Sequence, residues 1–312
     1  MRWDNEEADE RLDAIVARRL ELGLAETRRL IDAGLVRVAG RKAKKGDRVP
    51  AGTAIEMLAE VRGDDRDARR APVPEHGVFL DVVFEDDAIF AVNKPAGMPS
   101  HPLMPGERGT VANSIVAQAP ACAAASEDPR EGGLVHRLDV GTTGVLVAGK
   151  TRAAWTAMRR AFAEREVVKI YWALVHGELE LADEALLVLD APLATRGGTA
   201  RIARDTGDAL DARTEVSVLT RGGGYSLVEA RARTGRMHQI RAHLASAGHP
   251  LVGDPRYGAP YVDGVVRDEP LLHARSLSLP HPADGWRVTI SAHLPAARRA
   301  AIERLLGATA PT

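Results

Sequence analysis

Residues 132–151 read GGLVHRLDVGTTGVLVAGKT and place a charged tetrad, residues 136–139, between two apolar runs. A strand that is about to enter a core rarely carries two basic groups and a carboxylate. Either this is an ordinary loop closed by a salt bridge, or Asp139 performs chemistry. Burial raises the pKa of a carboxyl group, whereas a neighbouring guanidinium lowers it and fixes the geometry. A guanidinium beside Asp139 would therefore favour its ionised form in a pocket that excludes water.

Three further segments carry polar side chains of the kinds that enzymes use. They are NKPAGMPSHP at 93–102, VVKIYWALVHG at 167–177 and RTGRMHQIRAHLASAGHPLVGDPRYG at 233–258. Each has an ordinary structural interpretation when it is taken alone. Tyr171 fits a half-buried strand position, and Arg236 and Arg241 flank the start of a helix, where solvated arginines are common. The combination of segments must therefore decide the function.

The composition narrows the class of protein. The chain has 312 residues, enough for one large domain and a small one, and its 45% hydrophobic and 27% charged residues are typical of a soluble globular protein. Cys122 is the only cysteine, which excludes an internal disulfide and a cysteine-rich zinc site. No apolar run is long enough to span a membrane, and the first ten residues are acidic. We expect a cytoplasmic protein, and nothing in the chain requires more than a monomer.

Two common hydrolase patterns are missing from the sequence. HQIRAH, at 238–243, is not the His-Glu-x-x-His pattern of zinc metalloproteases, because no glutamate lies between its histidines. A serine hydrolase of the α/β type needs a Gly-x-Ser-x-Gly turn, and the chain has none. Neither a metal-dependent nor a serine hydrolase is indicated.

The first part of the chain has the pattern of a small α/β domain with a basic stripe. Residues 11–31 predict two short helices broken near Gly23, and the strand-like alternation that follows has turns at Ala39-Gly40 and at 50–52. Between residues 28 and 48, eight Lys and Arg stand against two Asp, a net charge of +6 in a protein of net charge −1. Such a stripe is either a solvated face or a surface for phosphate groups.

The order of these elements resembles the small S4-type RNA-binding domain. The resemblance covers RLDAIVARRL, ETRRLIDAGLVRVAG and VPAGTAIEM, with Ala39 where that family usually has Asn before the glycine. It implies that the stripe binds RNA. The residues assigned to this role are Arg28, Arg29, Arg41, Lys42, Lys44 and Lys45.

A polar, proline-containing linker at 63–77 is predicted to separate the S4-type domain, 1–62, from a second domain, 78–312. In the second domain we expect a hairpin around Asp86-Asp87, strands at 142–151 and 167–179, and helices at 152–166, 237–248 and 296–307. Because strands and helices do not alternate regularly, the pattern indicates an α+β fold rather than a doubly wound sheet.

Taken together, the four polar segments of the second domain resemble the RluA-type pseudouridine synthases, which isomerise uridine in structured RNA. The resemblance runs from about Val78 to about Ser278 and depends on HRLD followed by TGVLV, on GRMHQIRAHL and on GDPRYG. It implies a mixed, largely antiparallel sheet with flanking helices and a central cleft. It also implies no cofactor and no metal, because the N1–C1′ bond is exchanged for a C5–C1′ bond without redox change, group transfer or net hydrolysis.

The resemblance assigns catalytic roles to three residues. Asp139 is the nucleophile or base at the sugar, and the sequence leaves the choice open. Arg241 matches the family's basic partner of this carboxylate, with Arg236 as the alternative. Tyr171 matches a tyrosine whose ring stacks on the flipped uracil and whose phenol lies near the place where the C5 proton leaves. Asp254 is expected to be a structural bracket.

Further residues are expected to contact the substrate. Arg137 enters the vacated base stack or grips the distorted backbone. Arg236 and His238 complete the set, and His136 either belongs to it or supports the loop. Ribosomal RNA is favoured as the target because of the S4-type domain, with transfer RNA as a second possibility. The alternative function is a catalytically inactive RNA-binding ribosome-assembly factor on the same fold, which the presence of all three catalytic residues disfavours.

Overall fold

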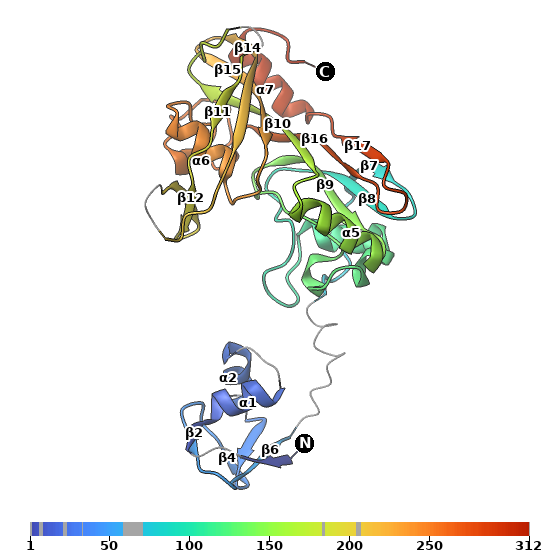
Figure 1. Ribbon diagram of the computed structural model, residues 1–312, viewed down its shortest axis with the longest axis vertical. Helices are drawn as coiled ribbons and strands as arrows, with labels where there is room; N and C mark the ends of the chain where they lie inside the picture. Colours follow the sequence, from blue (N-terminus) through green and yellow to red (C-terminus); the bar gives the residue numbers. More distant parts are fainter. Residues whose placement is uncertain are drawn as a thin grey trace. The chain divides into compact units, whose positions relative to one another are not determined.

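The structure, a computed structural model, describes residues 2–5, 9–20, 24–32, 34–58, 71–182, 185–203 and 207–311, except for the side chains of residues 24–26 and Arg29. The chain forms two compact units, Met1–Asp67 and Ala68–Thr312 (Figure 1). The division falls inside the segment that the sequence predicts as a linker. Residues 73–75 of that segment are fastened to the second unit, where Asn113 Nδ2 donates to Val73 O and Gly109 N donates to the Glu75 carboxylate.

The first unit packs two helices on a small sheet. Its elements are β1 (Arg2–Asp4), β2 (Glu10–Arg11), α1 (Leu12–Leu20), α2 (Leu24–Asp32), β3 (Val36–Val38), β4 (Arg41–Lys42), β5 (Arg48–Val49) and β6 (Ala54–Met57). The main sheet has the order β1-β6-β3-β4, and β2 pairs with β5. Leu12 and Ile31 of the helices pack on Val36 and Ile55 of the strands. Both predicted helices are present, while the predicted break at Gly23 lies outside the described residues.

The turn predicted at Ala39-Gly40 is a two-residue hairpin loop between β3 and β4. Both residues are left-handed, with φ of 47° at Ala39 and 78° at Gly40. A two-residue hairpin requires this conformation because it matches the twist of the strands. Asn tolerates it better than Ala does, which explains why Asn is usual at this position.

The second unit is built on one large sheet. Its strands are β7 (Asp81–Glu85), β8 (Ile89–Lys94), β9 (Thr143–Gly149), β10 (Val168–His176), β11 (Leu187–Leu189), β14 (Thr214–Gly222), β15 (Tyr225–Ala232), β16 (Leu272–Pro280) and β17 (Arg287–Ser291), with β12 (Leu193–Arg196) and β13 (Thr199–Ile202) as a separate hairpin. The order is β11-β14-β15-β10-β16-β9-β8-β7, with β17 on β16. Among these described strands only β9 and β16 pair in parallel, so the predicted α+β fold with a largely antiparallel sheet is confirmed.

Helices cover this sheet on both faces. They are α4 (Val111–Gln118), α5 (Arg152–Ala163), α6 (Gln239–Ser246) and α7 (Ala296–Leu306). Ala173 and Val175 of β10 pack with Leu244 of α6, whereas Leu174 of the same strand packs with Ile302 of α7. Because successive side chains of a strand point to opposite faces, α6 and α7 lie on opposite sides of β10 (Figure 1).

The predicted elements of this unit are all found. The hairpin turn is closed by Asp86, whose carboxylate accepts from the amides of Ala88 and Ile89. β9 follows the charged tetrad and is buried on both faces, with Val145 and Val147 in one core and Leu146 and Ala148 in another. The predicted helix at 237–248 begins only at Gln239, because His238 is left-handed with φ of 50°.

Candidate active site

The second unit contains a cleft of about 590 Å³. It is lined by every site residue that the sequence predicts in this unit, namely His136, Arg137, Asp139, Tyr171, Arg236, His238 and Arg241. These residues come from the loop before β9, from β10, and from the start of α6 and the loop before it. The fold thus gathers three distant segments of the sequence into one place.

Asp139 lies on a tight turn whose backbone is fixed by hydrogen bonds. The turn closes where Thr142 N donates to Asp139 O over 3.0 Å. Just before it, Ser100 Oγ donates to Leu138 O and accepts from Leu138 N, which fixes the chain leading into the turn. These bonds fix the backbone that carries the Asp139 side chain.

A buried lysine supports the same turn. Lys94, at the end of β8, is fully buried, and its ammonium donates to Val140 O and Thr142 O, both at 2.9 Å, and to Pro95 O at 2.8 Å. Three donors thus meet three carbonyls, which is the number that a lysine can satisfy. Lys94 connects the first strands of the sheet to the turn that carries Asp139.

A buried arginine from the last helix completes this support. Arg298 of α7 donates from Nη2 to Gly141 O over 2.6 Å and from Nη1 to the carbonyls of Pro270 and Leu272. Gly141 leaves no room for a side chain, because a Cβ there would lie 2.9 Å from Asp268 O. This close approach brings the loop before β16 against the turn, and Arg298 holds the two together.

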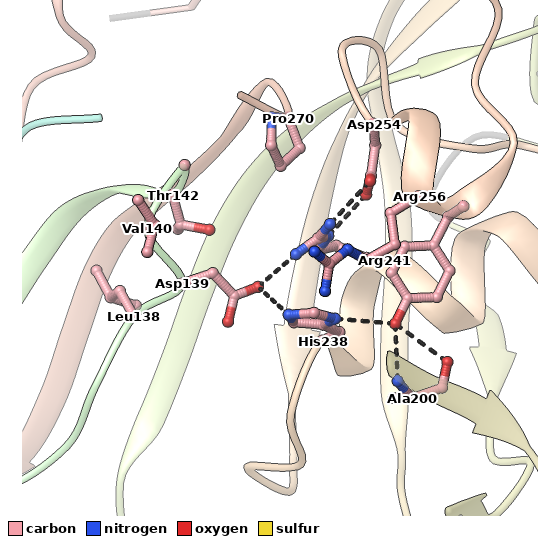
Figure 2. A network of polar contacts seen from close by, with 12 residues as sticks. Leu138, Asp139, Val140, Thr142, Ala200, His238, Arg241, Asp254, Arg256 and Pro270 are labelled. Atoms are coloured by element: carbon pink, nitrogen blue, oxygen red, sulfur yellow. Dashed lines mark hydrogen bonds and ion pairs between the residues drawn. The ribbon is translucent and has the colours of Figure 1, made fainter. Parts of the chain in front are cut away.

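Arg241 pairs with Asp139, and a second aspartate fixes the arginine (Figure 2). Arg241 Nη1 lies 3.0 Å from Asp139 Oδ2, while its Nε and Nη2 bind the two oxygens of Asp254 at 2.7 and 2.8 Å. The Asp254 side chain is only 1% exposed. Burial lowers the pKa of Arg241, but the bonds and charges of Asp254 and Asp139 outweigh it and raise the pKa. The guanidinium is therefore always charged and presents one N–H to Asp139.

Arg236, the alternative partner, is directed elsewhere. Its Nε donates to Asp211 O over 2.9 Å, and its backbone amide donates to the Gln239 side chain. The open question of which arginine pairs with Asp139 is thus answered by the geometry in favour of Arg241. Arg236 lines the cleft without touching the carboxylate.

Tyr171 and His136 lie in the cleft as neutral groups. Burial and the charge of Asp139 raise the pKa of the Tyr171 phenol above its usual value. His136 stacks on Phe162 with ring centroids 5.0 Å apart, and its Nε2 accepts from Val147 N. Burial lowers the pKa of His136 to about 3. This arrangement favours a supporting role for His136, because the ring is fixed to Val147 of β9 and stacks on Phe162 of α5.

His238 is a second side chain of the 233–258 segment that lies close to the Asp139 carboxylate. Its Nε2 lies 3.7 Å from Asp139 Oδ2, and its Nδ1 lies 3.0 Å from the hydroxyl of Tyr257. The Tyr257 hydroxyl donates to Ala200 O and accepts from Ala200 N, so the ring is tied to strand β13. The Arg241 guanidinium lies over the face of Tyr257, 5.1 Å from its centroid. Tyr257 thus supports both His238 and Arg241.

The predicted RNA-binding residues of the first unit fall into two groups, those that pair with an aspartate of the same unit and those that are exposed. Arg28 is bound to the buried Asp13 at 2.8 Å, and Lys45 pairs with Asp32 at 3.2 Å. Arg41, Lys42 and Lys44 are exposed on and after the β3–β4 hairpin. The side chain of Arg29 lies outside the described residues. In the second unit, Arg137 is exposed at the cleft.

Two residues that position the Asp139 turn, Lys94 and Arg298, are not among the site residues predicted from the sequence. Lys94 lies in the quoted segment NKPAGMPSHP, so its place before a proline at the end of an apolar strand was a usable signal. Arg298 lies in a helix of ordinary composition, and only the packing of α7 brings it to the site. Among the described residues, no group of His, Cys, Asp and Glu could hold a metal ion, and no helix there is long and apolar enough to cross a membrane.

Known proteins share both units of this chain. The family model described as RNA pseudouridylate synthase matches residues 88–246, and the S4 domain model matches residues 10–55. An uncharacterised RNA pseudouridine synthase of Mycobacterium bovis is 35% identical over 304 residues, which cover 95% of this chain and 94% of that protein. Ribosomal large subunit pseudouridine synthase D of Neisseria meningitidis is 34% identical over 305 residues, covering 91% of this chain and 76% of that protein.

The fold agrees with these sequence similarities. The solved structure of human RNA pseudouridylate synthase domain containing 4 aligns with a TM-score of 0.56 and 25% identity, over 72% of this chain and 92% of that one. Human RNA pseudouridylate synthase domain containing 1 aligns with a TM-score of 0.54 and 27% identity, over 71% and 86%. The chain belongs to the RluA-type RNA pseudouridine synthases, which are isomerases, and it carries an S4 RNA-binding domain in front of the catalytic domain.

Proposed function

We propose that this protein converts specific uridines of large-subunit ribosomal RNA to pseudouridine. The observation that carries the proposal is the Asp139 carboxylate at one wall of the cleft, held 3.0 Å from an arginine that a buried aspartate fixes. The printed name of the Neisseria relative, a ribosomal large subunit pseudouridine synthase, supports the choice of RNA. Transfer RNA is the second candidate substrate.

Asp139 acts at the ribose of the target nucleotide. It either attacks C1′ or removes a ribose proton, and the N1–C1′ bond breaks so that the uracil can turn and rejoin through C5. Both routes need an ionised carboxylate, and the charged Arg241 guanidinium donates to its Oδ2. Lys94 and Arg298 bind the backbone carbonyls of the turn that carries Asp139. The turn therefore does not have to change its conformation when the ribose binds beside the carboxylate.

The target uridine must leave its stack to reach Asp139. Unstacking costs a few kcal/mol, which contacts to the rest of the RNA must supply. Arg137 is exposed at the cleft two residues before Asp139, where a guanidinium can enter the vacated stack or bind the distorted backbone. Tyr171 offers a ring on which the flipped uracil stacks. The exposed cations of the S4 domain, Arg41, Lys42 and Lys44, supply sequence-independent contacts to phosphates.

One measurement distinguishes the proposed enzyme from the alternative, an inactive ribosome-assembly factor. RNA labelled with tritium at uridine C5 loses the label to water when pseudouridine forms. We expect release by the wild-type protein and none by Asp139→Asn, which keeps the shape of the side chain and still binds RNA. Release by Asp139→Asn at the wild-type rate would contradict the mechanism, and RNA binding without release by the wild type would establish the alternative. Mapping pseudouridines in ribosomal RNA from cells without the protein identifies the position.

A further inference from the structure

The cleft is rich in cations, and some of them are already paired with carboxylates. The described residues that line it carry two carboxylates, Glu131 and Asp139, against a larger set of basic side chains, Arg137, Arg159, Arg165, Lys169, Arg233, Arg236 and Arg241. Arg241 is bound by Asp254, and Arg233 pairs with Glu215 at 2.8 Å. The cations that remain are the ones that a negatively charged ligand can meet.

Lys169 and Arg236 differ from the other remaining cations in their burial. Both are half-buried, whereas Arg137, Arg159 and Arg165 are exposed. In the part of the chain that the structure describes, no carboxylate pairs with Lys169 or with Arg236. Removing a cation from water is unfavourable unless an opposite charge compensates it. A ligand with a negative charge would supply that compensation.

The hydrogen bonds of these two side chains fix them and use only part of their donors. Lys169 Nζ donates to Thr234 O over 2.7 Å, and an ammonium has three N–H groups. Arg236 Nε donates to Asp211 O over 2.9 Å, and a guanidinium has five N–H groups. Each side chain is thus held by a backbone carbonyl and has further donors for a ligand in the cleft that both line.

The fold holds these two like charges near each other. Burial and the charge of Arg236 lower the pKa of Lys169 to about 8, so the ammonium is still charged at neutral pH. Gly235 directly precedes Arg236, and a Cβ on this glycine would lie 3.6 Å from Lys169 Nζ. The backbone that leads into Arg236 therefore passes beside the ammonium. An anion bound by both cations would offset their repulsion and the loss of solvent around Lys169.

The position of Lys169 on β10 indicates which anion this is. Lys169 and Tyr171 both line the cleft and are two residues apart on the strand, so their side chains leave the same face of the sheet, about 7 Å apart along the strand. The uracil of the target nucleotide is proposed to stack on Tyr171. The anions next to that base are the two backbone phosphates on either side of its ribose.

We propose that Lys169 and Arg236 together bind one of the two phosphates that flank the target uridine. Lys169 contributes a point charge, and Arg236 contributes the terminal N–H groups of its guanidinium, which suit the oxygens of a phosphate. The site holds the RNA backbone beside the flipped nucleotide while Asp139 meets the ribose. The inference rests on the proposed function, because the stacking of the target base on Tyr171 is what brings a flanking phosphate to Lys169.

The test neutralises each flanking phosphate in turn in an RNA fragment from which the wild-type protein releases tritium. A methylphosphonate linkage removes the charge, and Asp139→Asn in every protein prevents turnover while Kd is measured. With Lys169 present, we expect one of the two linkages to weaken binding about tenfold, the scale of a hydrogen bond to a charged group. With Lys169→Met, unmodified RNA should bind about tenfold more weakly, and the same linkage should have no further effect.

The matched control is Lys150→Met. Lys150 Nζ is bound by Glu85 and by Asp86 O away from the residues that line the cleft, so this variant should keep both the affinity and the response to the linkage. A full response to the linkage in Lys169→Met would overturn the inference, as would an affinity that neither linkage changes. If Lys169→Met does not fold, the same comparison with Arg236→Gln decides.

The two proposals can fail separately. Tritium release by the wild-type protein together with binding that is insensitive to both linkages would defeat this inference and leave the proposed function intact. Absence of tritium release from every RNA tested would instead defeat the proposed function, and with it the assignment of the anion to a phosphate beside a target uridine.

Discussion

Asp139 and Arg241 are 102 residues apart in the chain, yet Nη1 of the arginine lies 3.0 Å from Oδ2 of the aspartate. The orientation of the guanidinium is fixed by Asp254, which binds its Nε and Nη2 and leaves Nη1 directed at the Asp139 carboxylate. Two buried basic side chains, Lys94 and Arg298, fix the backbone turn that carries the aspartate. The position of the Asp139 carboxylate is therefore set by Arg241 and by the turn that carries it.

Replacing Arg241 by Lys should reduce turnover strongly. A lysine carries the same charge but cannot bind Asp254 with two parallel bonds while it donates to Asp139. We expect kcat to fall about 10²-fold, a loss typical when a preorganised donor is removed. Arg236→Lys is the comparison for the pairing. The Arg236 Nε donates to the Asp211 carbonyl and not to Asp139, so any loss should appear in KM, as expected of a substrate contact, and kcat should stay at the wild-type value. Steady-state kinetics on ribosomal RNA fragments measure both, and equal losses would contradict the assigned pairing.

Replacing Arg298 by Gln should show that the last helix positions the catalytic turn. The variant leaves the Gly141 carbonyl without its donor, and a buried carbonyl left unsatisfied costs about 1–3 kcal/mol. The carbonyls of Pro270 and Leu272 also lose a bond, although each keeps a second donor. We expect lower thermal stability and a fall in kcat with KM unchanged, and Arg298→Lys should restore part of kcat. Arg299→Gln, on the same helix but bound to the chain end at Ala310 and Pro311, should leave kcat unchanged. A loss of stability without any change in kcat would contradict the positioning role.

Much of this site was predictable from the sequence because its polar residues lie in short local patterns. Asp139 stands shortly before an apolar run, and β9 is indeed buried on both faces. The hairpin β7–β8 was predictable because Asp86 caps its own turn. The hairpin β14–β15 also had a local signal, since Gly223 and Gly224 both have positive φ in a two-residue loop.

What could not be predicted depends on interactions between distant segments. The order of the sheet places β16, which begins at Leu272, between β9 and β10, which end far earlier in the chain at Gly149 and His176. Arg298 reaches Gly141 across 157 residues, and no periodicity in its helix distinguishes it from Arg299. The choice between Arg241 and Arg236 was open for the same reason. Both lie near the start of α6, and only the contact with the distant Asp254 directs Arg241 to Asp139.

Asp13 should make the stability of the S4 unit depend on pH. Its buried carboxylate binds Arg11 and Arg28, and these bonds lower its pKa from 3.8 to about 2. A folded-state pKa below the unfolded value means that the contribution is complete above pH 3.8 and is lost as the pH falls to about 2. The shift corresponds to about 2 kcal/mol, given about 1.4 kcal/mol for each pH unit.

The measurement is hydrogen exchange of α1 peptides in the full chain. Wild-type protection should fall between pH 3.8 and about 2, whereas Asp13→Asn should be less protected at neutral pH and lack this step. Asp32→Asn breaks the exposed pair with Lys45 and should change protection by less than about 1 kcal/mol. A wild-type step of the same size in Asp13→Asn would assign the pH dependence to another group.

Neutralising the exposed cations of the S4 unit should weaken RNA binding without changing the chemistry. In a variant with Arg41, Lys42 and Lys44 all changed to Gln, the plot of log affinity against log salt should become shallower by roughly 2, at about 0.7–0.9 for each phosphate that the protein no longer neutralises. A short RNA that fills only the catalytic cleft should keep its kcat, because Asp139 and Arg241 belong to the other unit. Arg18→Gln is the control, since Arg18 is paired with Glu10, and it should leave the salt slope unchanged. A slope unchanged in the triple variant would show that the S4 unit does not bind phosphates through this surface.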